Sequence, residues 1–295
     1  MFLNKEYLKF IEDSKQKGLD IVGTSVIETL GSTFAKPGNM MLVNSIGEFT
    51  GVLGSPFLHN KILEISKNIL KSKESYIFES VAQDESSGHG NSKYFSQPFF
   101  LSENYGVLGL SLKNIGKTLV RSIKDNSYKI LNEECNTKLE YDEFYQTIKS
   151  PYSLLVFGSG VHVKALIEMA NIMAWKTTII DIKMNKYVED ADKLIELEKL
   201  EDILTMDLSS YTASVILSHS PKTDDIYLRA LLDSNVEYIG MMGNKKNMQS
   251  KIEQFGLEND RRFFAPVGFD IGGNTQQSIA LSICSQIEAR KNGKI

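Results

Sequence analysis

The sequence predicts an α/β protein in which an N-terminal α+β domain precedes a C-terminal Rossmann-type domain with a parallel sheet. From residue 151 onwards, short β-branched runs alternate with amphipathic helical segments, the pattern of strands joined by crossover helices. Before residue 151, β-branched runs follow one another across turns, as in an antiparallel sheet. We therefore expect domains at 1–125 and 151–295, with a linker at 126–150.

The first segments read as one helix followed by a small meander. Tyr7, Leu8 and Ile11 form an apolar helical stripe. Ser55 is a suitable N-cap and Pro56 a suitable first residue for a second helix. The expected strands lie at 19–31, 40–44, 47–54 and 76–81.

The middle of the chain has weaker patterns. Residues 84–98 are rich in Gly, Ser and polar side chains and read as a long loop. Residues 104–120 are expected to supply further strands. The charged segment 124–149 shows weak helical patterning and little apolar density, which is why we expect the linker there.

A βαβ unit opens the second half, with strands at 153–158 and 176–181 around a helix at 161–174. The alternation continues, which implies a mostly parallel sheet. The further strands and helices are expected at 214–218, 225–233, 236–241 and 276–290.

The composition limits the classes of function. With 295 residues, the chain is long enough for two domains with their own cores. A net charge of -4 offers no general attraction for nucleic acid, and no run approaches the roughly 20 apolar residues of a membrane span. Two cysteines without CxxC spacing are typical of a reducing compartment. We therefore expect a cytoplasmic protein that binds neither nucleic acid nor membrane.

A glycine turn joins the first strand of the βαβ unit to its helix. Gly158 would permit a tight turn, and Gly160 would let main-chain N–H groups and the helix N-terminus approach a phosphate beside Ser159. Asp181, at the end of the next strand, is placed to bond a ribose hydroxyl. Val163 occupies the position of the third glycine, and an adapted nucleotide site and a purely structural turn fit the pattern equally well.

Several motifs stand in a characteristic order. The second half contains VILSH at 215–219, YIGMMGNKK at 238–246 and APVGFDIG at 265–272. The first half contains VIETLGST at 26–33, PGNMMLV at 37–43 and GEFTG at 47–51. In this order and spacing the chain resembles the XdhC/CoxI family, accessory proteins of molybdenum hydroxylases such as xanthine dehydrogenase.

The resemblance implies an accessory protein, rather than an enzyme, that binds molybdenum cofactor and assists its maturation and insertion. The ligand would be molybdopterin or its cytidine dinucleotide form. The implied partner is an apo molybdenum hydroxylase, with a cysteine desulfurase and a second copy of the chain as further options.

The candidate ligand-binding residues follow the predicted strands of the second half. His219 comes after a strand at the edge of a parallel sheet where ligands bind. Asn244 opens a helix that begins with Lys245 and Lys246, so an anion would meet free N–H groups and positive charge together. The full set is Gly158, Ser159, Gly160, Asp181, His219, Gly240, Gly243, Asn244, Lys245, Asp270 and Gly272.

The sequence departs from the family at its motif cysteine. The family's Ser-Gly-Gly-Cys-Val-Glu turn corresponds here to residues 54–59, and Phe57 stands at the cysteine position. A phenyl ring cannot coordinate molybdenum, so thiolate ligation at this site is excluded. We predict no protein metal site, and we interpret Cys135 and Cys284 as unreactive and His59 and His162 as surface residues.

Two other functions remain open. An NAD(P)-binding oxidoreductase would use the glycine turn and Asp181, although Val163 and the lack of a Tyr-x-x-x-Lys pair count against it. A degenerate, non-catalytic protein would keep the fold and act in assembly or regulation.

Overall fold

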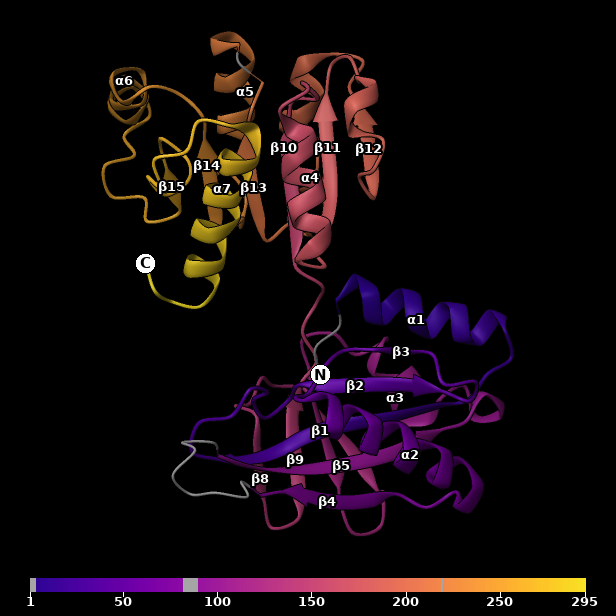
Figure 1. Cartoon of the computed structure of the whole chain (residues 1–295). Helices are drawn as coiled ribbons and strands as arrows, with labels where there is room; N and C mark the ends of the chain where they lie inside the picture. Colours follow the sequence, from indigo (N-terminus) through magenta and orange to yellow (C-terminus); the bar gives the residue numbers. More distant parts are fainter. Residues whose placement is uncertain (1–3, 82–89, 219) are drawn as a thin grey trace. The chain divides into compact units, whose positions relative to one another are not determined.

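The computed structural model describes residues 4–81, 90–218 and 220–295. The chain forms two compact units, a first unit of Met1–Pro151 and a second unit of Tyr152–Ile295. Both units are drawn in Figure 1. The observed architecture, an antiparallel α+β unit followed by a unit with a parallel sheet, confirms the predicted fold class.

A five-stranded antiparallel sheet organises the first unit, in the order β3-β2-β1-β5-β4. Its central strand β1 pairs with β2 on one side and β5 on the other. The strands are β1 (Ile21–Leu30), β2 (Met40–Asn44), β3 (Phe49–Thr50), β4 (Tyr76–Ser80) and β5 (Asn91–Phe99). The predicted loop at 84–98 is therefore wrong for its second half, because β5 is an inner strand that buries Tyr94, Phe95 and Phe99.

The two longer helices of the first unit both begin after a capping side chain, and the one at Pro56 begins where its cap predicts. Helix α1 (Lys5–Gln16) is capped by Asn4 and buries Tyr7 and Ile11. Helix α2 (Pro56–Ser72) starts at Pro56, and its Leu58 amide donates to Ser55 Oγ at 3.4 Å. Within 104–120, however, the chain forms helix α3 (Gly106–Ser111) and only one strand.

A second, four-stranded sheet completes the first unit, in the order β7-β6-β9-β8. Its strands are β6 (Thr118–Ser122), β7 (Tyr128–Leu131), β8 (Lys138–Glu140) and β9 (Glu143–Thr147). The segment 126–150, which we expected to be a linker with weak helical patterning, thus supplies three strands. These three strands are short and expose most of their charged residues. Their extended conformation therefore depends on pairing with neighbouring strands and on the burial of Phe144 against Phe95.

An arginine lies in the core between these two sheets. Arg121 on β6 is fully buried, and its Nη2 donates to Ser25 Oγ at 3.1 Å and to Gln146 Oε1 at 3.2 Å. Its guanidinium lies 5.8 Å from the ring centroid of Phe95 and 5.4 Å from that of Phe144. Its Nε and Nη1 have no partner among the described residues, and burial lowers the pKa of Arg121 to about 10. No sequence pattern predicted this group.

The second unit is built on a six-stranded parallel sheet in the order β12-β11-β10-β13-β14-β15. From the central β10 the chain proceeds to β11 and β12 on one side, and then crosses to β13, β14 and β15 on the other. This is the strand order of a Rossmann fold. The strands are β10 (Ser153–Phe157), β11 (Lys176–Asp181), β12 (Lys193–Glu196), β13 (Ala213–Ile216), β14 (Tyr238–Met241) and β15 (Phe263–Phe264).

Helices cover both faces of this sheet (Figure 1). Buried residues of α4 (Val163–Ile172) and α7 (Gln276–Lys291) share one core cluster, while those of α5 (Pro221–Leu232) and α6 (Lys245–Phe255) share the other. Two short 3-10 helices, η3 (Lys186–Val188) and η4 (Leu200–Thr205), flank β12. Within the described residues, no helix is long and apolar enough to cross a membrane.

The second unit is expected to lose stability at alkaline pH. Burial, and then the neighbouring Glu288, raise the pKa of the Cys284 thiol to about 12. An acid whose pKa is higher in the folded state than in the unfolded state stabilises the fold fully below its unfolded pKa and progressively less above it. Between about pH 8 and about pH 10.5, Cys284 alone should therefore cost about 2 kcal/mol of unfolding free energy.

Urea unfolding at these two pH values, followed by fluorescence of the single tryptophan Trp175, measures this loss. Burial also raises the pKa values of Tyr152 and Tyr238, so the total loss should exceed the cysteine contribution. A Cys284→Ala variant should show a pH-induced loss about 2 kcal/mol smaller. An identical loss in the variant would contradict the assignment to Cys284.

Candidate active-site edge of the parallel sheet

Parallel strands end at the same edge of a sheet, which we call the carboxyl edge. Turn 158–160 follows β10, Asp181 ends β11, and residues 243–245 follow β14. The segment 265–272 follows β15, and His219 lies outside the described residues. The crossovers from β10 and from β13 leave in opposite directions, so ligands of such folds bind between the ends of these two strands. The topology thus brings most of the predicted residues to one edge.

A glycine is required at position 158 because the backbone that follows β13 lies too close for a side chain. Its φ is +105°, and a β-carbon built on it would lie 2.8 Å from Leu217 O and 2.9 Å from Ser218 Cα. Its amide donates to Ile180 O at 2.9 Å. Any side chain here would overlap backbone, so this glycine closes the turn against the chain itself.

Ser159 is the most fully hydrogen-bonded residue that we find in the turn. It is only 1% exposed, and its hydroxyl donates to Asp181 Oδ2 at 2.6 Å, with Lys183 O 3.1 Å from the same oxygen. Ser159 Oγ accepts from Asn185 N at 3.2 Å and from Asn185 Nδ2 at 3.0 Å. Asp181 Oδ1 accepts from Ile182 N at 2.8 Å. Both carboxylate oxygens of the expected ribose-binding residue are therefore engaged within the chain.

The second glycine of the turn is covered by an imidazole ring. A β-carbon on Gly160 would lie 2.6 Å from Cε1 of His162, and His162 Nε2 lies 3.2 Å from Leu217 O. Helix α4 begins at Val163, which is fully buried in the core of the second unit. The valine at the third-glycine position is therefore accommodated by core packing and does not project from the turn.

A polar cluster of which the predicted motifs included only Ser218 lies at the end of β13. The Ser218 hydroxyl donates to Asp224, and Ser218 Oγ lies 2.8 Å from Thr223 Oγ1. Asp224 is buried in the first turns of α5. A run of Thr and Asp at 223–225 follows closely after the apolar strand pattern. This run is the sequence signal that indicates the polar cluster.

Tyr227 carries a buried hydroxyl beside this cluster. Its ring stacks on Phe157 with centroids 4.3 Å apart, and its hydroxyl has no hydrogen-bond partner among the described residues. Burial, and then the Asp181 and Asp224 carboxylates, raise the pKa of Tyr227. The Tyr227 hydroxyl therefore stays protonated and uncharged at neutral pH.

The start of α6 presents positive charge. Asn244 is its N-cap, and Asn244 Oδ1 accepts from Asn247 N at 2.9 Å. Lys245 and Lys246 are both exposed in the first turn, where helix N–H groups also favour an anion. An ion pair between Lys251 and Asp225 ties α6 to α5.

The glycines near β14 have packing roles. A β-carbon on Gly240 would overlap Cγ2 of Val267, and one on Gly243 would overlap Cε of Met248. Gly240 therefore lets the segment after β15 approach the sheet closely. The contact at Gly243 is with the flexible end of a methionine, which can shift at lower cost.

The segment 265–272 is anchored at one end and exposed at the other. Val267 N donates to Met241 O at 2.9 Å, and Gly268 N donates to Gln286 Oε1 at 2.9 Å on α7. Asp270 and Gly272 are exposed, and Gly272 N lies 3.3 Å from Asp270 Oδ1. These two residues belong to the exposed part of the segment.

No metal centre is built from the side chains at 4–81, 90–218 and 220–295, because no three of their His, Cys, Asp or Glu side chains converge to hold an ion. Phe57, at the position of the family's motif cysteine, is 78% exposed on α2. Cys135 is half-buried, and burial keeps Cys284 protonated at neutral pH.

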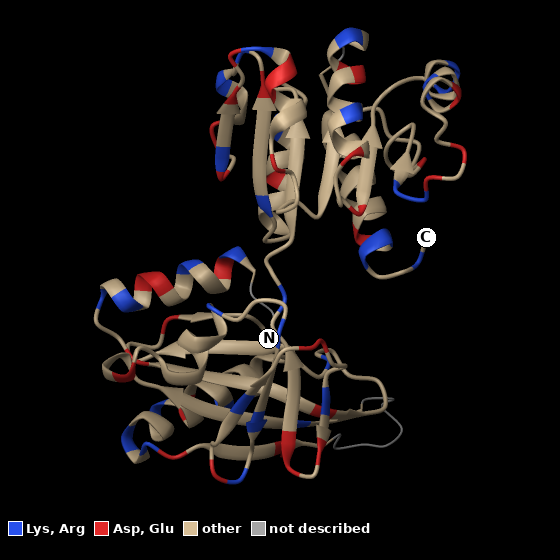
Figure 2. Cartoon of the chain, turned by 180° about the vertical axis from the view of Figure 1, so that it is seen from behind, with Lys and Arg blue, Asp and Glu red and all other residues tan. Residues whose placement is uncertain are grey.

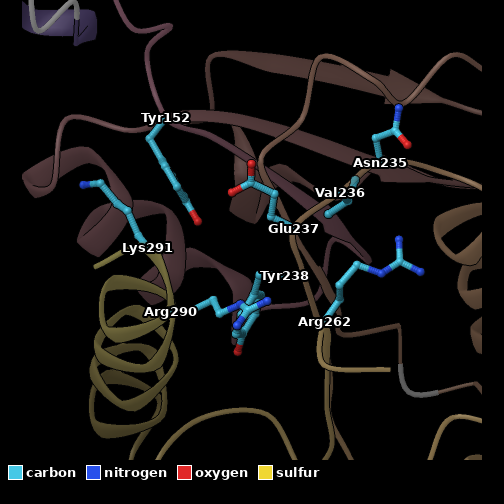
Figure 3. A pocket seen from close by; sticks show the side chains of 8 residues that line it. All are labelled: Tyr152, Asn235, Val236, Glu237, Tyr238, Arg262, Arg290 and Lys291. Atoms are coloured by element: carbon cyan, nitrogen blue, oxygen red, sulfur yellow. The ribbon is translucent and has the colours of Figure 1, made fainter. Parts of the chain in front are cut away.

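A hollow of about 420 Å³ lies at the opposite ends of the strands of the second unit, among residues that precede β10, β14 and β15 (Figure 3). Its cationic side chains already have partners. Arg262 Nη2 lies 2.7 Å from Asp260 Oδ2, Lys291 Nζ lies 3.1 Å from Glu288 Oε1, and Arg290 Nη1 donates to Ile295 O at 3.2 Å.

The carboxyl edge is the better anion site of the two. The lysines at the start of α6 are exposed and form no ion pair with any residue that the structure describes. Figure 2 shows that basic and acidic residues are otherwise interspersed over both units. An anion at the carboxyl edge would therefore not have to displace an existing partner of these lysines.

Comparisons with known proteins point to one family. Residues 154–287 match the model of the XdhC Rossmann domain, and residues 15–80 match the model of the XdhC and CoxI family. A Bacillus subtilis (strain 168) protein, whose name describes it as one subunit of a probable xanthine dehydrogenase, is 24% identical over 148 residues. These residues are 49% of this chain and 44% of that protein. The chain therefore matches less than half the length of this curated relative.

One solved structure has the same fold. It comes from Bacillus halodurans and is described as a xanthine dehydrogenase. It matches with a TM-score of 0.81 and 18% identity over 99% of this chain and 97% of the other. At that identity the match concerns the fold alone.

Proposed function

Because this chain belongs to the XdhC and CoxI family, we propose that it is an accessory protein in the maturation of a molybdenum hydroxylase such as a xanthine dehydrogenase. In this role it binds molybdenum cofactor and assists its insertion into the apo hydroxylase, in the cytoplasm. The name of the Bacillus subtilis relative supports the choice of hydroxylase. A cysteine desulfurase and a second copy of the chain are further proposed partners.

The described residues fit the phosphate end of the cofactor. The main-chain N–H group of the partly exposed Gly160 precedes α4, and Lys245 and Lys246 lie in the first turn of α6. Helix N-termini and lysine side chains both favour a phosphate. The arrangement of these groups along one sheet edge is the observation that carries the proposal.

The described residues do not fit the metal end. Phe57 replaces the family's motif cysteine, and the buried Cys284 is protonated at neutral pH. When bound, the cofactor supplies the molybdenum centre that the hydroxylase uses. The chain's contribution is therefore to hold the phosphate and orient the pterin.

Binding of cofactor by the full-length protein tests the proposal. Cofactor released from a molybdenum hydroxylase is titrated under anaerobic conditions and binding is followed by quenching of pterin fluorescence. A Lys245→Ala, Lys246→Ala double variant should bind about tenfold more weakly, because it loses charged contacts to the phosphate. A Lys67→Ala, Lys71→Ala variant on α2 removes the same charge elsewhere and should bind like the wild type.

Two outcomes would contradict parts of the proposal. Equal binding by both double variants would mean that α6 does not hold the phosphate. Absence of any cofactor binding by the wild type would favour the alternative of a degenerate assembly protein. Such a protein should still copurify with the hydroxylase. The NAD(P)-dependent alternative is disfavoured because Oδ2 of Asp181 is bonded to the buried Ser159 hydroxyl, so the carboxylate does not offer both oxygens to a ribose.

A further inference from the structure

We infer that the contact between Ser159 and Asp181 removes the paired acceptor that a ribose would need at the carboxyl edge, so that the site takes a phosphate monoester without a nucleoside in preference to a cytidine-linked ligand. This inference rests on the proposed function and names the form of the ligand. Ser159 and Asp181 act here as specificity-determining residues.

The first argument concerns the carboxylate. In dinucleotide-binding folds, the acid at the end of the second strand accepts hydrogen bonds from ribose hydroxyls. Here Asp181 Oδ2 lies 2.6 Å from Ser159 Oγ, which leaves no room for a hydroxyl between them. Asp181 Oδ1 accepts from the amide of Ile182 at 2.8 Å. A carboxylate oxygen accepts more than one hydrogen bond, so Oδ1 could still accept from one hydroxyl. With Oδ2 held by Ser159, however, the two oxygens are no longer both available to the two hydroxyls of a ribose.

The second argument concerns the loop that follows β11. Asn185 donates to Ser159 Oγ through its main-chain N at 3.2 Å and through Nδ2 at 3.0 Å. Met184 N donates to Glu196 Oε2 at 2.7 Å, which fixes the same loop to β12. Residues 182–185 are thus held against the glycine turn, next to Asp181.

The third argument is that displacement would be costly. Ser159 is 1% exposed, so pulling Asp181 away from it would cost this buried hydroxyl its carboxylate partner and leave Lys183 O, 3.1 Å away, as its acceptor. Losing a hydrogen bond to a charged acceptor costs more than losing an ordinary one. A phosphate monoester needs none of these groups, because it can be held by main-chain N–H groups and lysines.

Thermal stability and calorimetric binding of the full-length protein provide the test, with inorganic phosphate, glycerol 3-phosphate and CMP as probes. In the wild type, CMP should bind no more tightly than glycerol 3-phosphate. A Ser159→Gly variant frees Asp181 and should bind CMP about tenfold more tightly, with phosphate affinity changed less than about twofold. Adding Asp181→Asn to this variant should return the CMP affinity to that of the wild type.

Two further variants control for folding and for loss of a hydroxyl. Asn185→Ala releases the loop with little risk to folding and should raise CMP affinity about threefold. Ser209→Gly removes an exposed serine of the same unit and should change nothing.

The outcomes separate this inference from the proposed function. Wild-type protein that binds CMP about tenfold more tightly than glycerol 3-phosphate overturns the inference alone. So does a failure of both Ser159→Gly and Asn185→Ala to increase CMP affinity. If none of the three probes binds any of the variants, a phosphate site at this edge is refuted and both proposals fall.

Discussion

A Gly158→Ala variant is expected to lose about 3 kcal/mol or more of unfolding free energy in the second unit. The left-handed φ of +105° costs an alanine about 1–2 kcal/mol. The added methyl group would also lie 2.8 Å from Leu217 O, and forced contacts of this kind cost a further 1–3 kcal/mol or so. Urea unfolding followed by Trp175 fluorescence measures the loss.

The matched control is Gly256→Ala, in the same unit. Gly256 follows α6 with a φ of +65°, and a β-carbon built on it meets no atom within 4 Å. Its replacement should therefore cost only the backbone strain, about 1 kcal/mol. Equal losses in the two variants would refute the close backbone approach of β10 and β13.

An Arg121→Ala variant should lose about 3–5 kcal/mol in the first unit, whereas Arg121→Met should remain within about 1 kcal/mol of the wild type. Alanine leaves a cavity between Phe95 and Phe144 and leaves Ser25 Oγ and Gln146 Oε1 without their donor. Methionine fills the space between the rings and removes an uncompensated buried charge, which offsets the lost hydrogen bonds.

Thermal unfolding by circular dichroism measures both Arg121 variants, and Trp175 fluorescence identifies the transition of the second unit. Only the unfolding transition of the first unit should shift. If methionine is as damaging as alanine, the charge itself is required, and the guanidinium must have an anionic partner that the described residues do not supply.

The fold was predictable where the sequence is strongly periodic. In the βαβ unit, an apolar strand, a helix with buried Val163, Leu166 and Ala170, and a second apolar strand each carry their own signal. Strands β5, β7, β8 and β9 carry a weak signal, because polar residues alternate with few apolar ones. Their strand conformation depends on pairing with residues far away in the chain, such as Ser25 with Phe95.

The candidate site was predictable to the level of the sheet edge. Parallel topology alone brings the turn at 158–160 together with Asp181 and the start of α6. The sequence could not predict which way the Asp181 side chain turns, because that depends on where the loop around Asn185 folds. The sequence motif predicts a ligand-binding role for Gly240, whereas in the structure this glycine makes room for Val267. That contact depends on the path of the segment after β15, which no local pattern indicates.

The Ser159 hydroxyl has a consequence for how such proteins diverge. If Ser159 sets the form of the ligand as we infer, a single substitution during evolution would suffice to change that form. Relatives with identical glycine spacing would then bind different forms of a cofactor. The residue between the two glycines, together with the loop that contacts it, is then a better guide to ligand class than the glycines themselves.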